Sequence, residues 1–114
     1  MHWPLFRIAV VEPSMVPALY PGDWLLVLRT NRIRPGQLVI AINPQTPDML
    51  VVKRATHLAD DDTWWLDSDN PYAGAVDSHR FGPVPAALIT GRVVVRYWPI
   101  RNGRWRITKP RPRR

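Results

Sequence analysis

Proline and glycine interrupt this chain so often that long helices are excluded. The 114 residues include 13 Pro and 6 Gly, and only 48–70 is a long stretch free of both. Proline removes a backbone donor and clashes with the preceding helical turn, and glycine weakens a helix interior. We therefore expect helices of at most one or two turns.

Short runs rich in branched and aromatic residues lie between these breakers, as is typical of β-strands. The runs are 5–11, 24–28, 38–42, 49–55, 64–66, 88–97 and 105–108. Turn-forming sequences such as Pro21-Gly22-Asp23 and Pro35-Gly36 separate them. The pattern predicts an all-β, mainly antiparallel fold, either a sandwich or a partly open barrel.

The charge distribution separates a neutral body from a basic C-terminus. Residues 1–100 hold nine Lys or Arg and nine Asp or Glu, so the net charge of +7 comes from 101–114. We predict a single domain over 1–100, with a last strand that can extend to 108. Residues 109–114 are predicted to be a disordered basic tail, because proline and like charges oppose compaction.

No segment of the sequence predicts a membrane anchor, and no disulfide can form. The chain has no cysteine, which excludes disulfides and thiolate metal sites. Its apolar runs fall far short of the roughly 20 residues of a spanning helix, and the N-terminus does not read as a secretory signal. We expect a cytoplasmic protein without a transmembrane anchor, and peripheral membrane contact stays open.

The histidines predict neither a metal site nor a familiar triad. His2, His57 and His79 lack the close spacing of metal ligands, and no G-x-S-x-G sequence surrounds a serine. A Ser-His-Asp arrangement is therefore disfavoured, and we expect no metal and no cofactor.

Lys53 is the sharper candidate for chemistry. It lies in an apolar run in which the two-residue period of a strand places Val51, Lys53 and Ala55 on one face. If that face is buried, desolvation lowers the lysine pKa and leaves a neutral amine that can act as a base. The alternative is a lysine whose stem packs while its ammonium reaches water.

Four motifs occur in an order that resembles the serine-lysine signal peptidases. Residues 11–19, followed by Pro21-Gly22-Asp23, are similar to that family's S-M-x-P-T-L...G-D sequence. Val52-Lys53-Arg54 resembles its V-K-R sequence. Residues 68–84 resemble its G-D-N...S-x-D-S-R-x-F-G-x-V sequence, and Gly91-Arg92-Val93 matches its closing strand. The resemblance covers residues 8–98.

This resemblance implies a hydrolase that cleaves peptide bonds through an acyl-enzyme. Ser14 would attack the carbonyl, Lys53 would transfer protons, and the Ser14 backbone N–H would bind the oxyanion. Supporting roles in the turn, the substrate groove and the surrounding structure are implied for Met15, Pro17, Arg54, Asp69, Asp77 and Ser78. Arg54 would pair with Asp69 or Asp77.

Within that family, the small unanchored chain resembles the nickel-type superoxide dismutase maturation proteases. The implied partner is a precursor protein with a cleavable N-terminal leader. Several positions depart from the family pattern: Ser68 replaces a glycine and His79 an arginine. Glu12, near the oxyanion site, and Ala75, where the family has a serine that bonds the lysine, leave open whether catalysis is weakened.

Two other functions remain open. A LexA-like self-cleaving domain uses the same residue pair on a related fold. A catalytically inactive peptidase-like domain would instead act as a binding module. Nucleic acid is not expected as a partner, because the neutral charge of 1–100 argues against a continuous basic groove.

Overall fold

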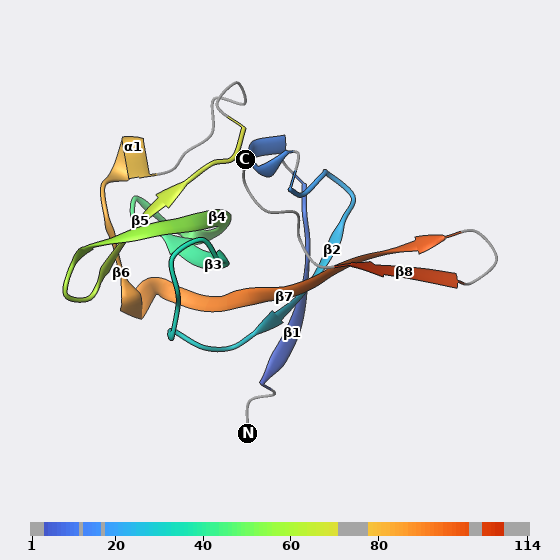
Figure 1. Ribbon diagram of the computed structural model, residues 1–114. Coiled ribbons are helices and arrows are strands. Elements are labelled where there is room, and N and C mark those ends of the chain that lie inside the picture. The colour runs from blue at the N-terminus through green and yellow to red at the C-terminus, as the bar shows by residue number, and fades with distance from the viewer. Residues whose placement is uncertain (1–3, 12, 17, 71–77, 101–103, 109–114) are drawn as a thin grey trace.

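The computed structural model describes residues 4–11, 13–16, 18–70, 78–100 and 104–108, and its regular structure is almost entirely β (Figure 1). Three helical elements are single turns: η1 (Pro13–Met15), α1 (Ser78–Phe81) and η2 (Ala86–Leu88). The strands are β1 (Leu5–Ala9), β2 (Trp24–Leu28), β3 (Leu38–Asn43), β4 (Thr46–Asp60), β5 (Thr63–Asp67), β6 (Val84–Pro85), β7 (Ile89–Ile100) and β8 (Arg104–Thr108). The predicted all-β class and the short helical turns are confirmed.

One antiparallel sheet contains all these strands, and β7 organises it. The order along the sheet is β1-β2-β7-β3-β4-β5-β6, with β8 paired to β7. The long β7 pairs with β2, β3 and β8 at successive positions along its length. It therefore runs through the whole molecule in Figure 1, and its far end forms a projecting hairpin with β8.

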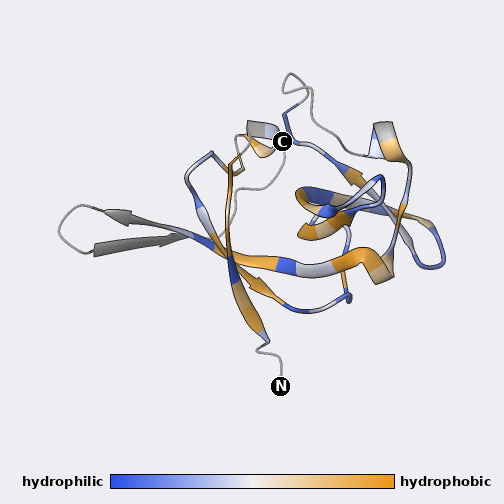
Figure 2. Ribbon diagram, turned by 180° about the vertical axis from the view of Figure 1, so that it is seen from behind, coloured by the Kyte–Doolittle hydropathy of each residue, from blue (hydrophilic) through white to orange (hydrophobic). Residues whose placement is uncertain are grey.

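The central strand β3 is buried on both faces. Leu38 and Ile40 belong to an apolar cluster shared with β2 and the turn around Met15. Val39 and Ala41, which point the opposite way, belong to a second cluster shared with β4 and β5. Figure 2 shows apolar residues along the strands and hydrophilic ones concentrated in the loops. Val52 of β4 packs against the first cluster and Val51 and Ala55 belong to the second, so β4 is packed against β3 by both.

The structure differs from the predicted strands mainly in the length of β4 and in one additional short strand. All seven predicted runs contain a strand, but β4 continues well beyond both ends of 49–55. The short β6 was missed, since it spans only Val84–Pro85 and proline is a poor strand former. Residues 109–114, predicted to be a disordered tail, lie outside the described residues.

Candidate active site

Ser14 lies in a tight turn that follows β1. The Val10 N–H donates to the Asp23 carbonyl over 2.8 Å, so the chain beyond β1 is still tied to the start of β2. The Leu19 N–H donates to the Met15 carbonyl over 2.9 Å and closes the turn behind η1. These contacts hold Ser14 at the end of a strand, where it is 6% exposed.

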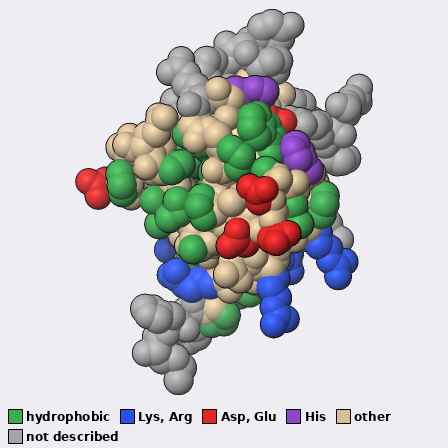
Figure 3. Space-filling model, turned by 90° about the vertical axis from the view of Figure 1, so that its left-hand side faces the viewer, with side chains coloured by type: hydrophobic (Ala, Val, Ile, Leu, Met, Phe, Trp, Pro, Cys, Tyr) green, Lys and Arg blue, Asp and Glu red, His purple; other side chains and the backbone are tan. Residues whose placement is uncertain are grey.

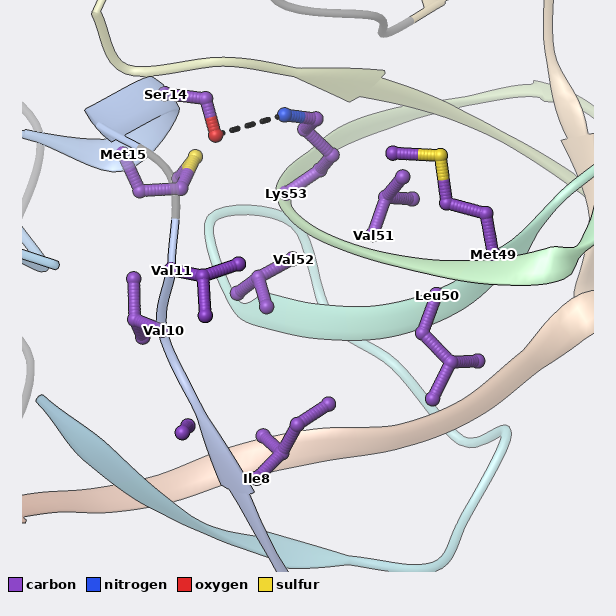
Figure 4. Close-up of a pocket in the computed structure, with 11 residues that line it drawn as sticks. Ile8, Val10, Val11, Ser14, Met15, Met49, Leu50, Val51, Val52 and Lys53 are labelled. Atoms are coloured by element: carbon purple, nitrogen blue, oxygen red, sulfur yellow. Dashed lines mark hydrogen bonds between the residues drawn. The ribbon is translucent and has the colours of Figure 1, made fainter. Parts of the chain in front are cut away.

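Lys53 reaches this serine from the middle of β4. Its strand neighbours Val51 and Ala55 are buried together in one cluster, as the two-residue period predicted. Lys53 is 2% exposed, and its Nζ donates to Ser14 Oγ over 2.9 Å. Figure 4 shows the two side chains pointing toward each other from η1 and β4. The fold thus brings together two residues that are 39 positions apart.

The segment after β5 contacts both the turn that carries Ser14 and the strand that carries Lys53. Arg54, next to Lys53, donates to both oxygens of Asp69 over 3.1 and 2.6 Å. The Asn70 N–H donates to the Ser14 carbonyl over 2.9 Å, and the Asp69 N–H lies 3.4 Å from the sulfur of Met15. Segment 69–70 therefore joins the lysine strand to the serine turn.

A pocket of about 220 Å³ opens beside the Ser14–Lys53 contact. Its walls are 8–11, which comprise the end of β1 and the two residues after it, and 49–53 of β4, with Ser14 and Met15 at one end (Figure 4). Except for Ser14 and Lys53, every lining side chain is apolar. The pocket therefore suits an apolar substituent placed next to the serine hydroxyl.

Both walls present strand edges that are unpaired among the described residues. β1 ends the strand order and pairs with β2 alone. β5 pairs with β4 only from Arg54 onward, which leaves the outer edge of 49–53 open. Unpaired backbone groups on such edges can accept an added extended strand. The pocket is thus bounded by two possible pairing sites for a peptide.

Ser78 has a structural position away from the pocket. It begins α1, is 2% exposed, and its Oγ accepts a hydrogen bond from the Leu66 N–H over 2.8 Å. It therefore anchors β5 rather than lining the apolar pocket. The other singled-out positions lie outside the described residues: Glu12, Pro17, Ala75 and Asp77.

His57 and His79 flank Trp65 and do not line the pocket. Their rings lie 6.2 and 5.3 Å from the indole, measured between centroids. His79 Nε2 lies 3.0 Å from Asp67 Oδ1. Within the described part of the chain, no group of three metal-ligating residues occurs. The arrangement gives no support to a Ser-His-Asp site.

The sequence analysis did not identify the two segments that form the walls of the apolar pocket, or the contact of Asn70 with the serine turn. Residues 8–11 and 49–52 read only as apolar strand residues, and nothing local shows which strand edges stay unpaired. Asn70 contributes through its backbone N–H, which side-chain patterns do not reveal. The available signal was the position of 8–11 directly before the candidate nucleophile.

Comparisons with known proteins point to one family. The profile of the family described as Peptidase S24-like matches residues 3–97. Mitochondrial inner membrane protease subunit 1 of Xenopus tropicalis is 31% identical over 113 residues, covering 79% of this chain and 67% of that protein. Mitochondrial ATP-independent inner membrane protease subunit 1a of Arabidopsis thaliana is 33% identical over 113 residues, with 76% and 67% covered. The chain thus spans about two-thirds of the length of these relatives.

These comparisons confirm a peptidase of the signal-peptidase type and correct another prediction. The expected cytoplasmic location is wrong, because the relatives are named as proteases of the mitochondrial inner membrane. That expectation rested on the lack of a long apolar run, which does not determine a compartment. In the described residues, every helix is too short or too polar to span a membrane. None of these relatives is named for nickel superoxide dismutase.

Proposed function

Because the chain belongs to the Peptidase S24-like family, we propose that it is a serine endopeptidase with Ser14 as nucleophile and Lys53 as general base. One observation carries the proposal: Lys53 Nζ lies 2.9 Å from Ser14 Oγ in a site nearly closed to solvent. This distance lies in the range that proton transfer between a nucleophile and its base requires.

The surroundings of Lys53 favour the form that a base needs. An ammonium group loses hydration when it is buried, so burial at 2% exposure favours the neutral amine. In the neutral amine, the hydrogen bond can reverse, with the Ser14 hydroxyl donating to the nitrogen lone pair. The nitrogen is then placed to take the proton as the serine oxygen attacks.

Acylation then proceeds with two proton transfers. Ser14 Oγ bonds to the scissile carbonyl carbon while its proton passes to Lys53 Nζ. When the tetrahedral intermediate collapses, the C–N bond breaks and the lysine ammonium gives this proton to the leaving amine. The Ser14 backbone N–H is the proposed donor to the oxyanion. Water, deprotonated by the same amine, hydrolyses the ester and releases Ser14.

The substrate is proposed to be an extended segment of a precursor protein. It would lie between 8–11 and 49–53, pair with one or both open strand edges, and place apolar side chains in the pocket. This arrangement suits the removal of an N-terminal leader, the activity implied by the signal-peptidase resemblance. The leader of a nickel superoxide dismutase precursor remains one candidate, supported by the sequence resemblance alone.

The test is cleavage of a peptide library, followed by mass spectrometry. Wild-type protein should cleave a subset with apolar residues before the cut, whereas Ser14→Ala and Lys53→Met should leave all peptides intact. Lys109→Met makes the same chemical change at the other lysine of the chain, and it should retain activity. Turnover by Ser14→Ala would refute the mechanism. Cleavage of this chain alone, with no peptide cut, would favour the LexA-like alternative. Binding of peptides by the wild-type protein without cleavage would favour the catalytically inactive binding module.

A further inference from the structure

A second pocket lies where the connection between β2 and β3 folds beside β7. Its volume is about 480 Å³, and its lining includes three arginines. We call it the arginine pocket, defined by Leu28, Thr30, Arg32, Arg34, Gln37 and Arg92. It shares no lining residue with the apolar pocket beside Ser14.

One wall is fixed by a close approach of two strands. A Cβ added at Gly91 would lie 2.5 Å from the Leu28 carbonyl oxygen, so this contact requires glycine. The approach pairs Leu28 of β2 with Arg92 of β7. Arg92 also pairs with Val39 of β3, so its backbone is held by strands on both sides. The sheet therefore sets the position of this arginine.

The opposite wall is the loop between β2 and β3, in which side chains form hydrogen bonds with the loop's own backbone. Thr30 Oγ1 accepts a hydrogen bond from the Arg32 N–H over 3.0 Å. Gln37 Oε1 accepts one from the Arg34 N–H over 2.9 Å. These bonds fix the backbone from which the two arginines project. A site whose backbone is already ordered loses less entropy when a ligand binds.

The charge in this pocket is not compensated by an ion pair within the described residues. The ion pairs found there involve Arg54, Arg96 and His79, and none involves an arginine of the pocket. Figure 3 shows Lys and Arg side chains gathered along one edge of a face, below a group of acidic side chains. Like charges that share a pocket repel each other, and an anion bound between them replaces this repulsion by attraction. The fold thus concentrates positive charge that the neutral total of 1–100 conceals.

We propose that the arginine pocket binds a phosphate ester. A phosphate group offers several oxygens in a tetrahedral arrangement, and guanidinium forks bind such oxygens in pairs. A single carboxylate has two oxygens and satisfies fewer guanidinium groups. The volume lies within the range of small-molecule sites, and Leu28 supplies an apolar contact for the carbon part of the ester. The ester can be a free metabolite or a phospholipid head group.

Binding of sn-glycerol 3-phosphate, measured by calorimetry on the full chain, tests the site. The double variant Arg32→Gln/Arg34→Gln should bind at least about tenfold more weakly, because it loses charge-assisted hydrogen bonds. Arg34→Lys should lose part of the affinity, since an ammonium has no planar fork. The matched control is Arg7→Gln/Arg29→Gln, which removes two exposed arginines outside the pocket and should stay within about twofold of wild type.

Vesicles separate the two sources of the ester. Flotation with phosphatidylglycerol vesicles, compared with phosphatidylcholine vesicles, should show the same dependence on Arg32 and Arg34 if the ligand is a head group. Binding to glycerol 3-phosphate without vesicle binding assigns a free ester. Melting curves check that each variant is folded. The proposal is overturned if neither probe binds, or if the control variant loses binding as much as the pocket variant.

Discussion

Arg54 and Asp69 form a two-point ion pair beside the candidate active site, with side chains only 7% and 3% exposed. Arg54 directly follows Lys53, and Asp69 directly precedes the residue whose N–H binds the Ser14 carbonyl. The pair therefore connects the supports of the proposed base and nucleophile. Its loss should affect both stability and activity.

Asp69→Leu should destabilise the fold by about 3–5 kcal/mol, because it removes a carboxylate that is paired with a buried guanidinium. Urea unfolding measures this effect. Asp61→Leu removes an exposed carboxylate in the turn between β4 and β5 and should change stability by less than about 0.5 kcal/mol. Equal losses for the two variants would show that the Arg54–Asp69 pair has no special structural role.

Activity should depend on pH through Lys53. The base must be neutral, so kcat/KM should rise with pH through an apparent pKa below the usual lysine value of about 10.4. Below that pKa, the ammonium form cannot accept the serine proton. Lys53→Arg should be inactive at every pH, since a guanidinium does not deprotonate in a protein.

The histidine variants provide the control for this pH profile. His57→Ala and His79→Ala should keep the wild-type curve, because neither residue lines the pocket. A curve that shifts or flattens in either variant would assign the titration to a histidine. Unchanged turnover by Lys53→Met would leave Lys53 a structural residue.

Gly91→Ala should destabilise the sheet by about 1–3 kcal/mol, because overpacking forces the surrounding backbone to shift. The added methyl would meet the Leu28 carbonyl oxygen at 2.5 Å. Thermal unfolding measures the effect. Gly22→Asn is the comparison, since a Cβ there meets nothing within 4 Å and asparagine tolerates the positive φ of 96°. A melting temperature unchanged in Gly91→Ala would show that β7 can move away from β2.

Removal of residues 109–114 should leave the fold intact. The truncated chain ends at Thr108, the last residue of β8, so the pairing of β7 with β8 is retained. The prolines and like charges of the removed segment predict that it contributes nothing to a packed core. We expect a melting temperature within a few degrees of the full chain, and a large drop would show that the tail packs.

Sequence alone determined the local features of this protein. Breakers and β-rich runs located the strands, because turn and strand preferences act between neighbouring residues. The two-residue period placed Lys53 on the face shared with Val51 and Ala55, and the motif resemblance paired it with Ser14. The sequence motifs are therefore sufficient to indicate a peptidase.

Only the tertiary structure determined the contacts and pockets formed by residues that are distant in the sequence. The 2.9 Å contact of Lys53 with Ser14 depends on β3, which packs against the turn around Met15 on one face and shares an apolar cluster with β4 on the other. The open edge of 49–53 depends on where β5 stops pairing with β4, and the open edge of β1 depends on its place at the end of the strand order. The arginine pocket depends on how β7 meets β2 at Gly91. Register and sheet order arise from many long-range contacts acting together, and no short stretch of sequence contains them.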